Sequence, residues 1–190
     1  MPGAIRVDIT DPQAVAAAWA DVTRDGAVTG LVNAAGICRR KGFTELSLDD
    51  WREMFRVNVE GTFLTCAAAV PHMIDAGGGS IVNFASLAAV RPPKTALAHY
   101  AASKGAVLAF TRALAAEVAP HRIRANAAIP GVIETAMIGD TFTAEEQDAY
   151  RKQAGLGRFG TPEEVAQLVA FLLSDAASLV NGAGIEIPAA

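Results

Sequence analysis

Three side chains in the middle of the sequence have the types and the spacing to transfer a proton. Tyr100 and Lys104 are four residues apart, and Ser86 ends an apolar run before them. Residues four apart on a helix share a face, so we expect the ammonium group of Lys104 beside the phenol of Tyr100. A neighbouring ammonium group favours the phenolate and lowers the tyrosine pKa from its usual value of about 10. The pair could then move a proton to or from a substrate oxygen that the Ser86 hydroxyl also holds.

A tyrosine and a lysine at this spacing are also common on the exposed face of ordinary helices, so the surrounding elements matter. Short apolar runs alternate with longer segments of helical periodicity. The runs predict strands over 4–9, 28–32, 80–85, 123–129 and 183–188. The longer segments predict helices over 11–24, 48–75 and 99–119, a short helix within 139–160, and a helix from Pro162 to about residue 173. We expect Pro71 to kink or divide the second of these helices.

This alternation is typical of a parallel sheet with helices on both faces. Ligands bind in such sheets beyond the carboxyl ends of the strands. The residues that follow Val32, Ala85 and Ile129 are therefore the first candidates for a functional site. Ser86 directly follows one of these predicted strands, which supports its assignment to the site.

Composition and charge exclude several other classes of protein. Hydrophobic residues make up 52% of the 190 residues, which excludes a mainly disordered chain. The net charge of -4 argues against nucleic acid as a partner. No apolar run is long enough to predict a membrane span. The three histidines share no metal-ligand spacing, and the two cysteines suggest a reducing environment, so we expect a cytoplasmic protein without a metal.

Six segments in order make the sequence similar to the short-chain dehydrogenase/reductase family, over nearly the whole chain. They are VDITD (7–11), LVNAAG (31–36), NVEG (58–61), GSIVNFAS (79–86), YAASK (100–104) and PGVIET (130–135). The second resembles the family's Asn-Asn-Ala-Gly motif, with Ala34 in place of the second asparagine. The resemblance implies hydride transfer between NAD or NADP and a secondary alcohol or ketone.

The resemblance also implies a role for each catalytic residue. Tyr100 would be the general acid and base, and Lys104 would lower its pKa and bind the nicotinamide ribose. Ser86 would orient the substrate oxygen, and Asn58 would hold a water in a proton relay that reaches Lys104. The alternative for Asn58 is a local bond to the backbone.

Further residues would contact the cofactor, Asp8 at the adenine ring and Ile133 and Thr135 at the carboxamide and phosphate side. Asp8 is equally well explained as a turn or cap residue. The implied cofactor-binding set is Asp8, Asn33, Ala35, Gly36, Tyr100, Lys104, Pro130, Gly131, Ile133 and Thr135.

The sequence departs from the family at its start, where no glycine-rich turn follows a strand. Its first predicted strand resembles the family's third. We therefore expect one incomplete domain over 1–190, a three-layer Rossmann-like parallel sheet that lacks the first two strands and the glycine-rich turn. A fragment of a longer enzyme, a natural truncated relative, and an oligomer that shares cofactor sites all remain open.

The departure affects the expected activity. Without a glycine-rich turn, free cofactor should bind poorly, and the chain should be poorly stable and inactive although its catalytic residues are present. Its first strand could then move beside 28–32. The alternative function is that of an inactive relative acting as a binding or oligomerisation partner. The alanine-rich helices over 48–75 and 99–119 are those that commonly pair in this family, so we expect a homodimer or homotetramer.

The basic run from Arg39 to Lys41 predicts a solvated loop. Its place near the expected rim of the site also suits an anionic or polyhydroxy substrate.

Overall fold

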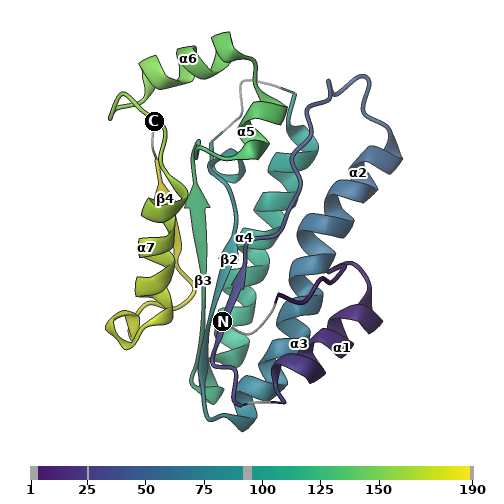
Figure 1. Cartoon of the computed structure of the whole chain (residues 1–190), viewed down its shortest axis with the longest axis vertical. Helices are drawn as coiled ribbons and strands as arrows, with labels where there is room; N and C mark the ends of the chain where they lie inside the picture. The colour runs from purple at the N-terminus through teal and green to yellow at the C-terminus, as the bar shows by residue number, and fades with distance from the viewer. Residues whose placement is uncertain (1–3, 25, 92–95, 189–190) are drawn as a thin grey trace.

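The computed structural model describes residues 4–24, 26–91 and 96–188, and its centre is a four-stranded parallel sheet (Figure 1). The strands lie in chain order, β1 (Gly30–Asn33), β2 (Gly79–Phe84), β3 (Ile123–Pro130) and β4 (Gly184–Ile187). In the register Asn33 lies opposite Asn83, and Ser80 lies opposite Arg124. The predicted parallel sheet is confirmed: each of the four strands ends within one residue of the expected position, and β1 begins two residues later than expected.

Helices cover both faces of this sheet. The described helices are α1 (Pro12–Val22), α2 (Leu48–Phe55), α3 (Gly61–Asp75), α4 (Ala98–Val118), α5 (Ala136–Thr141), α6 (Ala144–Gln153) and α7 (Pro162–Leu173). Figure 1 shows α3 and α4 on one side of the strands and α7 on the other, with α1 outside α3. The three-layer arrangement is therefore confirmed. No helix in the described part of the chain combines the length and apolar character that crossing a membrane requires.

The hydrophobic core lies on both sides of the sheet. On the α3 and α4 side, Met73 and Ala115 pack with strand residues such as Ile81 and Ala125, and Cys66 belongs to the same cluster. On the α7 side, Leu172 packs against Val82 and Ala128, with further residues of α7 around them. Side chains from alternate strand positions enter opposite clusters, as a sheet buried on both faces requires.

Polar residues fix where several helices begin. Asp11 caps α1, and its side chain accepts from the amide of Gln13 at 2.8 Å. Ser47 and Thr161 each form a capping box with an acidic residue three positions on, Asp50 at α2 and Glu164 at α7. These side chains satisfy amide groups that a helix leaves unpaired at its first turn. The helix predicted over 11–24 begins one residue later, at Pro12, and the start predicted at Pro162 is confirmed.

The long predicted helix 48–75 is divided, but not at its proline. Pro71 lies inside α3, where the helix continues through it. The interruption is a π-helical turn, Arg56–Glu60, between α2 and α3. The Asn58 side chain at the centre of this turn is bonded to the backbone of Ile37. An inserted turn of this kind moves a side chain out of the regular helical register, so that it can reach a partner outside the helix.

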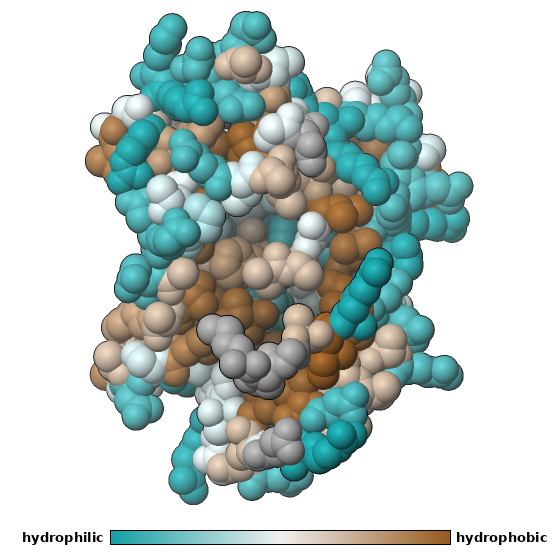
Figure 2. Space-filling model, in the orientation of Figure 1, coloured by the Kyte–Doolittle hydropathy of each residue, from teal (hydrophilic) through white to brown (hydrophobic). Residues whose placement is uncertain are grey.

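The strand predicted over 4–9 is wrong, because 4–8 has no strand pairing and residues 9 and 10 form a turn. Asp8 belongs to this turn and accepts from the Thr10 amide at 2.9 Å. Nor has the segment moved beside β1, whose described pairing is to β2 alone. Ile5 and Val7 are 47% and 36% exposed, and Val32 of β1 is 40% exposed. Figure 2 shows apolar residues gathered around a hollow in the middle of the face of the molecule that is turned to the viewer.

Two other regions differ from the expectation in detail. The region 139–160 holds the whole of α6, the short helix predicted there, and also the end of α5, which was not predicted. The segment between the strand predicted over 80–85 and the helix predicted over 99–119 begins with a 3-10 turn, Leu87–Ala89, and its prolines at 92 and 93 lie outside the described residues.

A buried polar ladder crosses the sheet between α3 and α4. The Thr65 hydroxyl donates to Asn33 Oδ1 at 2.7 Å, Asn33 Nδ2 donates to Asn83 Oδ1 at 2.8 Å, and Asn83 Nδ2 donates to the Thr111 hydroxyl at 3.0 Å. Asn83 and Thr111 are fully buried. The ladder satisfies side chains that would otherwise be costly to bury.

Candidate active site

The structure brings Ser86, Tyr100 and Lys104 together at the carboxyl end of β2. Ser86 lies two residues beyond β2 in extended backbone, and its hydroxyl accepts from the Ala88 amide at 3.2 Å. The Ser86 side chain lies close enough to Tyr100 to lower the pKa of its phenol. Tyr100 and Lys104 both lie in the first two turns of α4. A strand end and a helix start thus position the three side chains, as their spacing in the sequence predicts.

Lys104 is buried, and its Nζ donates to the Phe84 carbonyl oxygen at 2.7 Å. Burial lowers the pKa of Lys104 to about 8, because the charged form loses its hydration. The carbonyl group fixes the ammonium group at the end of β2. Lys104 is therefore a cation held in place by the strand that also carries Ser86.

Tyr100 does not show the lowered pKa that the sequence predicts. Burial raises the pKa of Tyr100 to about 12, and the hydrogen bond to Ser86 only partly offsets this effect. The pKa also responds to the nearby Cys38, whereas Lys104 is turned to the Phe84 carbonyl group. The phenol is therefore protonated at neutral pH in this structure, so Tyr100 is ready to donate a proton rather than to accept one.

Asn58 is fully buried and links the loop after β1 to α4. Its Oδ1 accepts from the Ile37 amide at 2.8 Å, and its Nδ2 donates to the Ile37 carbonyl oxygen and to the Ser103 hydroxyl, each at 3.0 Å. The Asn58 side chain therefore binds backbone outside its own helix. The sequence analysis considered only a relay water or a local backbone bond as its partner. Ser103 directly precedes Lys104, so Asn58 supports the turn of α4 that carries the lysine.

The glycine of the LVNAAG segment lies where β1, Asn58 and Lys104 meet. A Cβ atom built on Gly36 would lie 3.0 Å from Asn58 Oδ1 and 3.4 Å from Lys104 Nζ. The Asn33 side chain is hydrogen-bonded within the buried ladder, whereas Ala35 is exposed. Of these candidates, Gly36 is therefore the one in contact with the Lys104 region.

The remaining cofactor candidates lie in two places. Pro130 ends β3 next to Gly131, whose amide donates to the Ile187 carbonyl oxygen at 3.0 Å. Ile133 pairs with Gly160, and Thr135 precedes α5 without a side-chain capping bond. These four follow the carboxyl end of β3. Asp8 lies in the exposed turn before α1, where its bonds to Thr10 lower its pKa.

Two contacts near the site were missed by the sequence analysis. Cys38 lies close enough to Tyr100 and Lys104 to affect the pKa of each. Arg40 pairs with Glu146 of α6 at 2.7 Å and lies over the Phe142 ring at 5.5 Å. Arg40 and Glu146 are 106 positions apart, and no local pattern in a single sequence signals such a pair.

Replacing Lys104 with methionine tests its burial through the pH dependence of stability. Between the lowered native pKa of about 8 and the higher unfolded value, the native state binds fewer protons, so this lysine makes the free energy of unfolding rise with pH. The parent should therefore gain about 2 kcal/mol relative to Lys104→Met between pH 8 and pH 10 in urea titrations. Lys152→Met, at an exposed lysine of α6, is the matched control and should show no such gain. If the difference in free energy of unfolding between parent and Lys104→Met stayed constant from pH 8 to pH 10, Lys104 would not be buried as the structure shows.

The parallel sheet with helices on both faces, and with polar groups at its carboxyl edge, defines a Rossmann-like α/β domain. Residues 2–187 match a family model described as enoyl-(acyl carrier protein) reductase. The chain is 40% identical over 181 residues to D-threitol dehydrogenase of Mycolicibacterium smegmatis, covering 95% of this chain and 69% of that protein. The 3-oxoacyl-(acyl-carrier-protein) reductase FabG of Aquifex aeolicus is 41% identical, covering 83% of this chain and 62% of that protein.

Solved structures agree with this result. A gluconate 5-dehydrogenase from Burkholderia cenocepacia J2315, in complex with NADP and tartrate, superimposes with a TM-score of 0.90 at 35% identity, covering 96% of this chain and 72% of that one. The chain belongs to the short-chain dehydrogenase/reductase family. The curated relatives are matched over between 60% and 80% of their length.

Proposed function

We propose that this chain carries the proton-transfer half of an oxidoreductase that moves a hydride between NAD or NADP and a secondary alcohol or ketone. The observation that carries the proposal is geometric: Ser86 lies just beyond β2, Lys104 Nζ donates to the Phe84 carbonyl oxygen at the end of the same strand, and Tyr100 lies one turn before Lys104 in α4. We place this function in one incomplete Rossmann-like domain over 1–190. D-threitol dehydrogenase and FabG are named as a dehydrogenase and a reductase, which favours an enzyme over an inactive binding partner, although a third relative is named an inactive dehydrogenase.

Each residue of the site has a task that follows from its surroundings. The Ser86 hydroxyl donates to the substrate oxygen and orients it toward Tyr100. Tyr100, which is protonated at neutral pH, donates its proton to that oxygen when a ketone is reduced. The charge of Lys104 stabilises the phenolate that remains. Asn58 positions the loop that carries Gly36 against Lys104.

The residues present fit one end of a dinucleotide. The bare Gly36 backbone beside Lys104 permits close approach of a ligand, and Thr135 offers a hydroxyl group without a capping bond. Ile133, Tyr100 and Lys104 would hold the nicotinamide end, and the bound nicotinamide would supply or accept the hydride. The described residues contain no glycine-rich turn that joins a strand to a helix for the phosphate end, so this part of the family pattern is not matched here.

Turnover with the substrates of the relatives is the direct test. Nucleotide fluorescence should first establish whether NADH or NADPH binds. Absorbance at the reduced nicotinamide band should then follow oxidation of threitol and gluconate, and reduction of a 3-oxoacyl thioester. Each compound belongs to the class of substrate after which one of the relatives is named. A chain that binds the dinucleotide and turns over none of them, nor simpler secondary alcohols and ketones, would contradict the proposal.

We also propose that the chain self-associates through α3 and α4. Phe63 of α3 is 52% exposed, and its ring packs edge-on against Phe110 of α4 at 6.2 Å. These aromatic rings lie on the alanine-rich helices that the sequence analysis identifies as the pairing surface. Large exposed aromatic side chains favour association when a second apolar surface can cover them.

A further inference from the structure

A long segment between β3 and α7 projects from the carboxyl edge of the sheet. It is closed at its base, where the Glu134 amide donates to the Gly160 carbonyl oxygen at 2.9 Å and the Gly160 amide donates to the Val132 carbonyl oxygen at 3.1 Å. α5 and α6 lie in this segment, at the end of the molecule to which the β3 arrow points in Figure 1. The base fixes where the segment begins and ends, but not the position of the two helices beyond it.

α5 and α6 contribute little to the hydrophobic core. No residue of α6 is buried, and no described residue of either helix belongs to the core clusters. The contacts that Tyr150 and Gln147 of α6 make with Phe142 stay within the segment. Regions with few buried apolar contacts open at a low cost in free energy. Side chains from outside the segment must therefore hold the two helices in place.

Arg40, in the loop after β1, is such a side chain. Its Nη1 donates to the two carboxylate oxygens of Glu146 at 2.7 Å and 2.9 Å and to the Thr141 carbonyl oxygen at 3.3 Å. Its guanidinium group lies 5.5 Å from the centre of the Phe142 ring. Among the described residues, every hydrogen bond from 135–153 to an earlier part of the chain comes from Arg40. The side chains of the Arg40–Glu146 pair are 29% and 33% exposed, so solvent screens this ion pair less than a fully exposed one.

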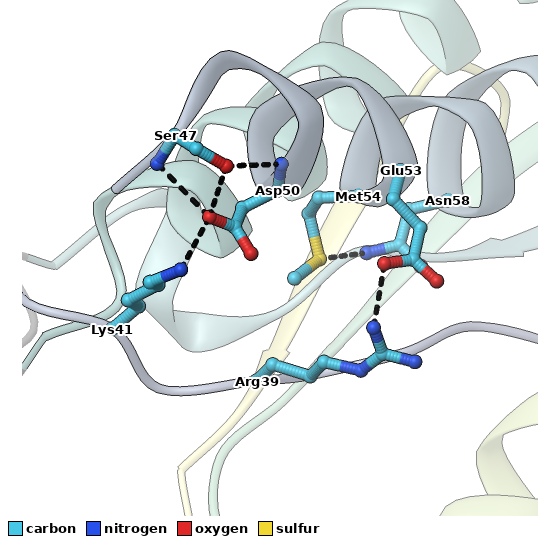
Figure 3. A network of polar contacts seen from close by, with 7 residues as sticks. All are labelled: Arg39, Lys41, Ser47, Asp50, Glu53, Met54 and Asn58. Atoms are coloured by element: carbon cyan, nitrogen blue, oxygen red, sulfur yellow. Dashed lines mark hydrogen bonds and ion pairs between the residues drawn. The ribbon is translucent and has the colours of Figure 1, made fainter. Parts of the chain in front are cut away.

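The two neighbours of Arg40 fix its loop to α2. Arg39 bonds Glu53 Oε2 at 2.5 Å, and Lys41 bonds Asp50 Oδ2 at 2.6 Å. Figure 3 shows both basic side chains extending from the loop toward α2. Arg40, between them, reaches α6 instead. The predicted basic run is therefore neutralised pair by pair and does not form a free cationic patch. Its three residues connect α6 to α2.

The contact between Arg40 and the end of α5 lies beside Cys38. Burial raises the pKa of the Cys38 thiol, and the nearby Thr141 side chain partly offsets this rise. Cys38 in turn lies close enough to Tyr100 to affect the pKa of the phenol. Thr141 is buried and Cys38 is half-buried. Movement of α5 away from the loop would therefore uncover Cys38 and this side of the candidate site.

We propose that Arg40 is a positioning residue that latches α5 and α6 against the loop after β1. Its bonds to Glu146 and to the Thr141 carbonyl oxygen keep the segment closed. When these bonds break, α5 and α6 move about the base at Gly160, and Cys38 becomes accessible. The latch goes beyond the proposed function, because the closed position is a property of the fold and does not depend on hydride transfer.

Alkylation by iodoacetamide measures the latch without enzyme activity, because the two cysteines report different events. Cys38 reports opening of α5, whereas Cys66 is 1% exposed in the core and reports global unfolding. Arg40→Gln should speed alkylation of Cys38 about tenfold, equivalent to about 1.4 kcal/mol, and leave Cys66 at the parent rate. The charge of Arg40 lowers the pKa of Cys38, so its loss alone would slow the reaction. A faster reaction therefore reports opening, and peptide mass spectrometry separates the two sites.

Further variants test whether Arg40 acts through Glu146. Glu146→Gln removes the charge, but glutamine can still form the capping box of α6, so Cys38 should react as fast as in Arg40→Gln. The double variant should be no faster than either single variant, because both remove the same contact. Arg40→Lys keeps the charge and should restore most of the protection. Arg39→Gln breaks the neighbouring pair on the α2 side and should react like the parent.

Limited digestion with trypsin provides a second measurement, at the other end of the segment. Arg151 and Lys152 lie in the last turn of α6 and should be cut faster in Arg40→Gln than in Arg39→Gln. Glu146→Gln changes a partly exposed side chain and decides the question if Arg40→Gln does not fold. The proposal is overturned if these variants alkylate Cys38 at the parent rate, if alkylation of Cys66 accelerates equally, or if the two single effects add in the double variant.

Discussion

Replacing Tyr100 with phenylalanine is expected to lower turnover by about 10²–10⁴-fold, which is the usual contribution of a general acid. The substitution removes the hydroxyl group that contacts Ser86 and keeps the ring in α4. The far-ultraviolet circular dichroism spectrum and the urea midpoint should therefore remain close to those of the parent. Steady-state rates of ketone reduction with NADH and NADPH provide the measurement.

The chain offers a matched control and a readout that needs no turnover. Tyr150 is the only other tyrosine, and it packs edge-on against Phe142 at 5.2 Å. Tyr150→Phe should retain activity. In an alkaline absorbance titration, burial should delay ionisation of Tyr100 to a pKa of about 12, and this late transition should be absent from Tyr100→Phe alone. Activity that survives in Tyr100→Phe would refute the assigned role.

Replacing Asn58 with alanine should have the largest effect on stability among single substitutions in the site. The variant loses bonds to the Ile37 amide, the Ile37 carbonyl oxygen and the Ser103 hydroxyl. Because Asn58 is fully buried, water cannot easily take its place, and we expect the free energy of unfolding to fall by about 2–4 kcal/mol. Turnover should fall as well, since the loop that carries Gly36 is released from Lys104. Urea titrations of parent and variant measure the first effect.

Asn181 provides the comparison for this experiment. Its side chain also makes two backbone bonds, to the Ala125 amide at 3.0 Å and the Ala115 carbonyl oxygen at 3.1 Å, but the residue is exposed. Because the Asn181 side chain is exposed, water can enter the space that it leaves, so Asn181→Ala should cost only about 1 kcal/mol. Equal losses in the two variants would show that burial does not set the cost at Asn58.

The sequence predicts the sheet well because its signals there are local. Apolar runs mark β2 and β3, and Thr161 with Pro162 marks the start of α7. The segment 4–9 has the same local character as a strand, but it has no neighbouring strand to pair with in the described chain. Pairing is a tertiary property, so composition cannot decide it.

The site is predictable to the same extent. The spacing of Tyr100 and Lys104 implies a shared helix face, and the structure places Tyr100 near Ser86 and Lys104 against the Phe84 carbonyl group. The predicted lowering of the Tyr100 pKa was wrong. The shift depends on the burial of Tyr100 and on the Phe84 carbonyl group that binds Lys104, and neither can be predicted from the spacing. The π-helical turn at Asn58 likewise depends on a partner 21 positions away. These features arise from contacts that spacing does not encode.

The buried ladder from Thr65 to Thr111 affects which alignments of the strands are possible. β1 has four residues and one described neighbour, so its backbone bonds alone distinguish poorly between registers. A shift by one residue would turn Asn33 to the opposite face and leave the Asn83 amide without its partner. Slipped arrangements thus carry buried, unsatisfied amides, which widens the energy gap between them and the native state. The ladder therefore allows so short an edge strand to adopt a single alignment.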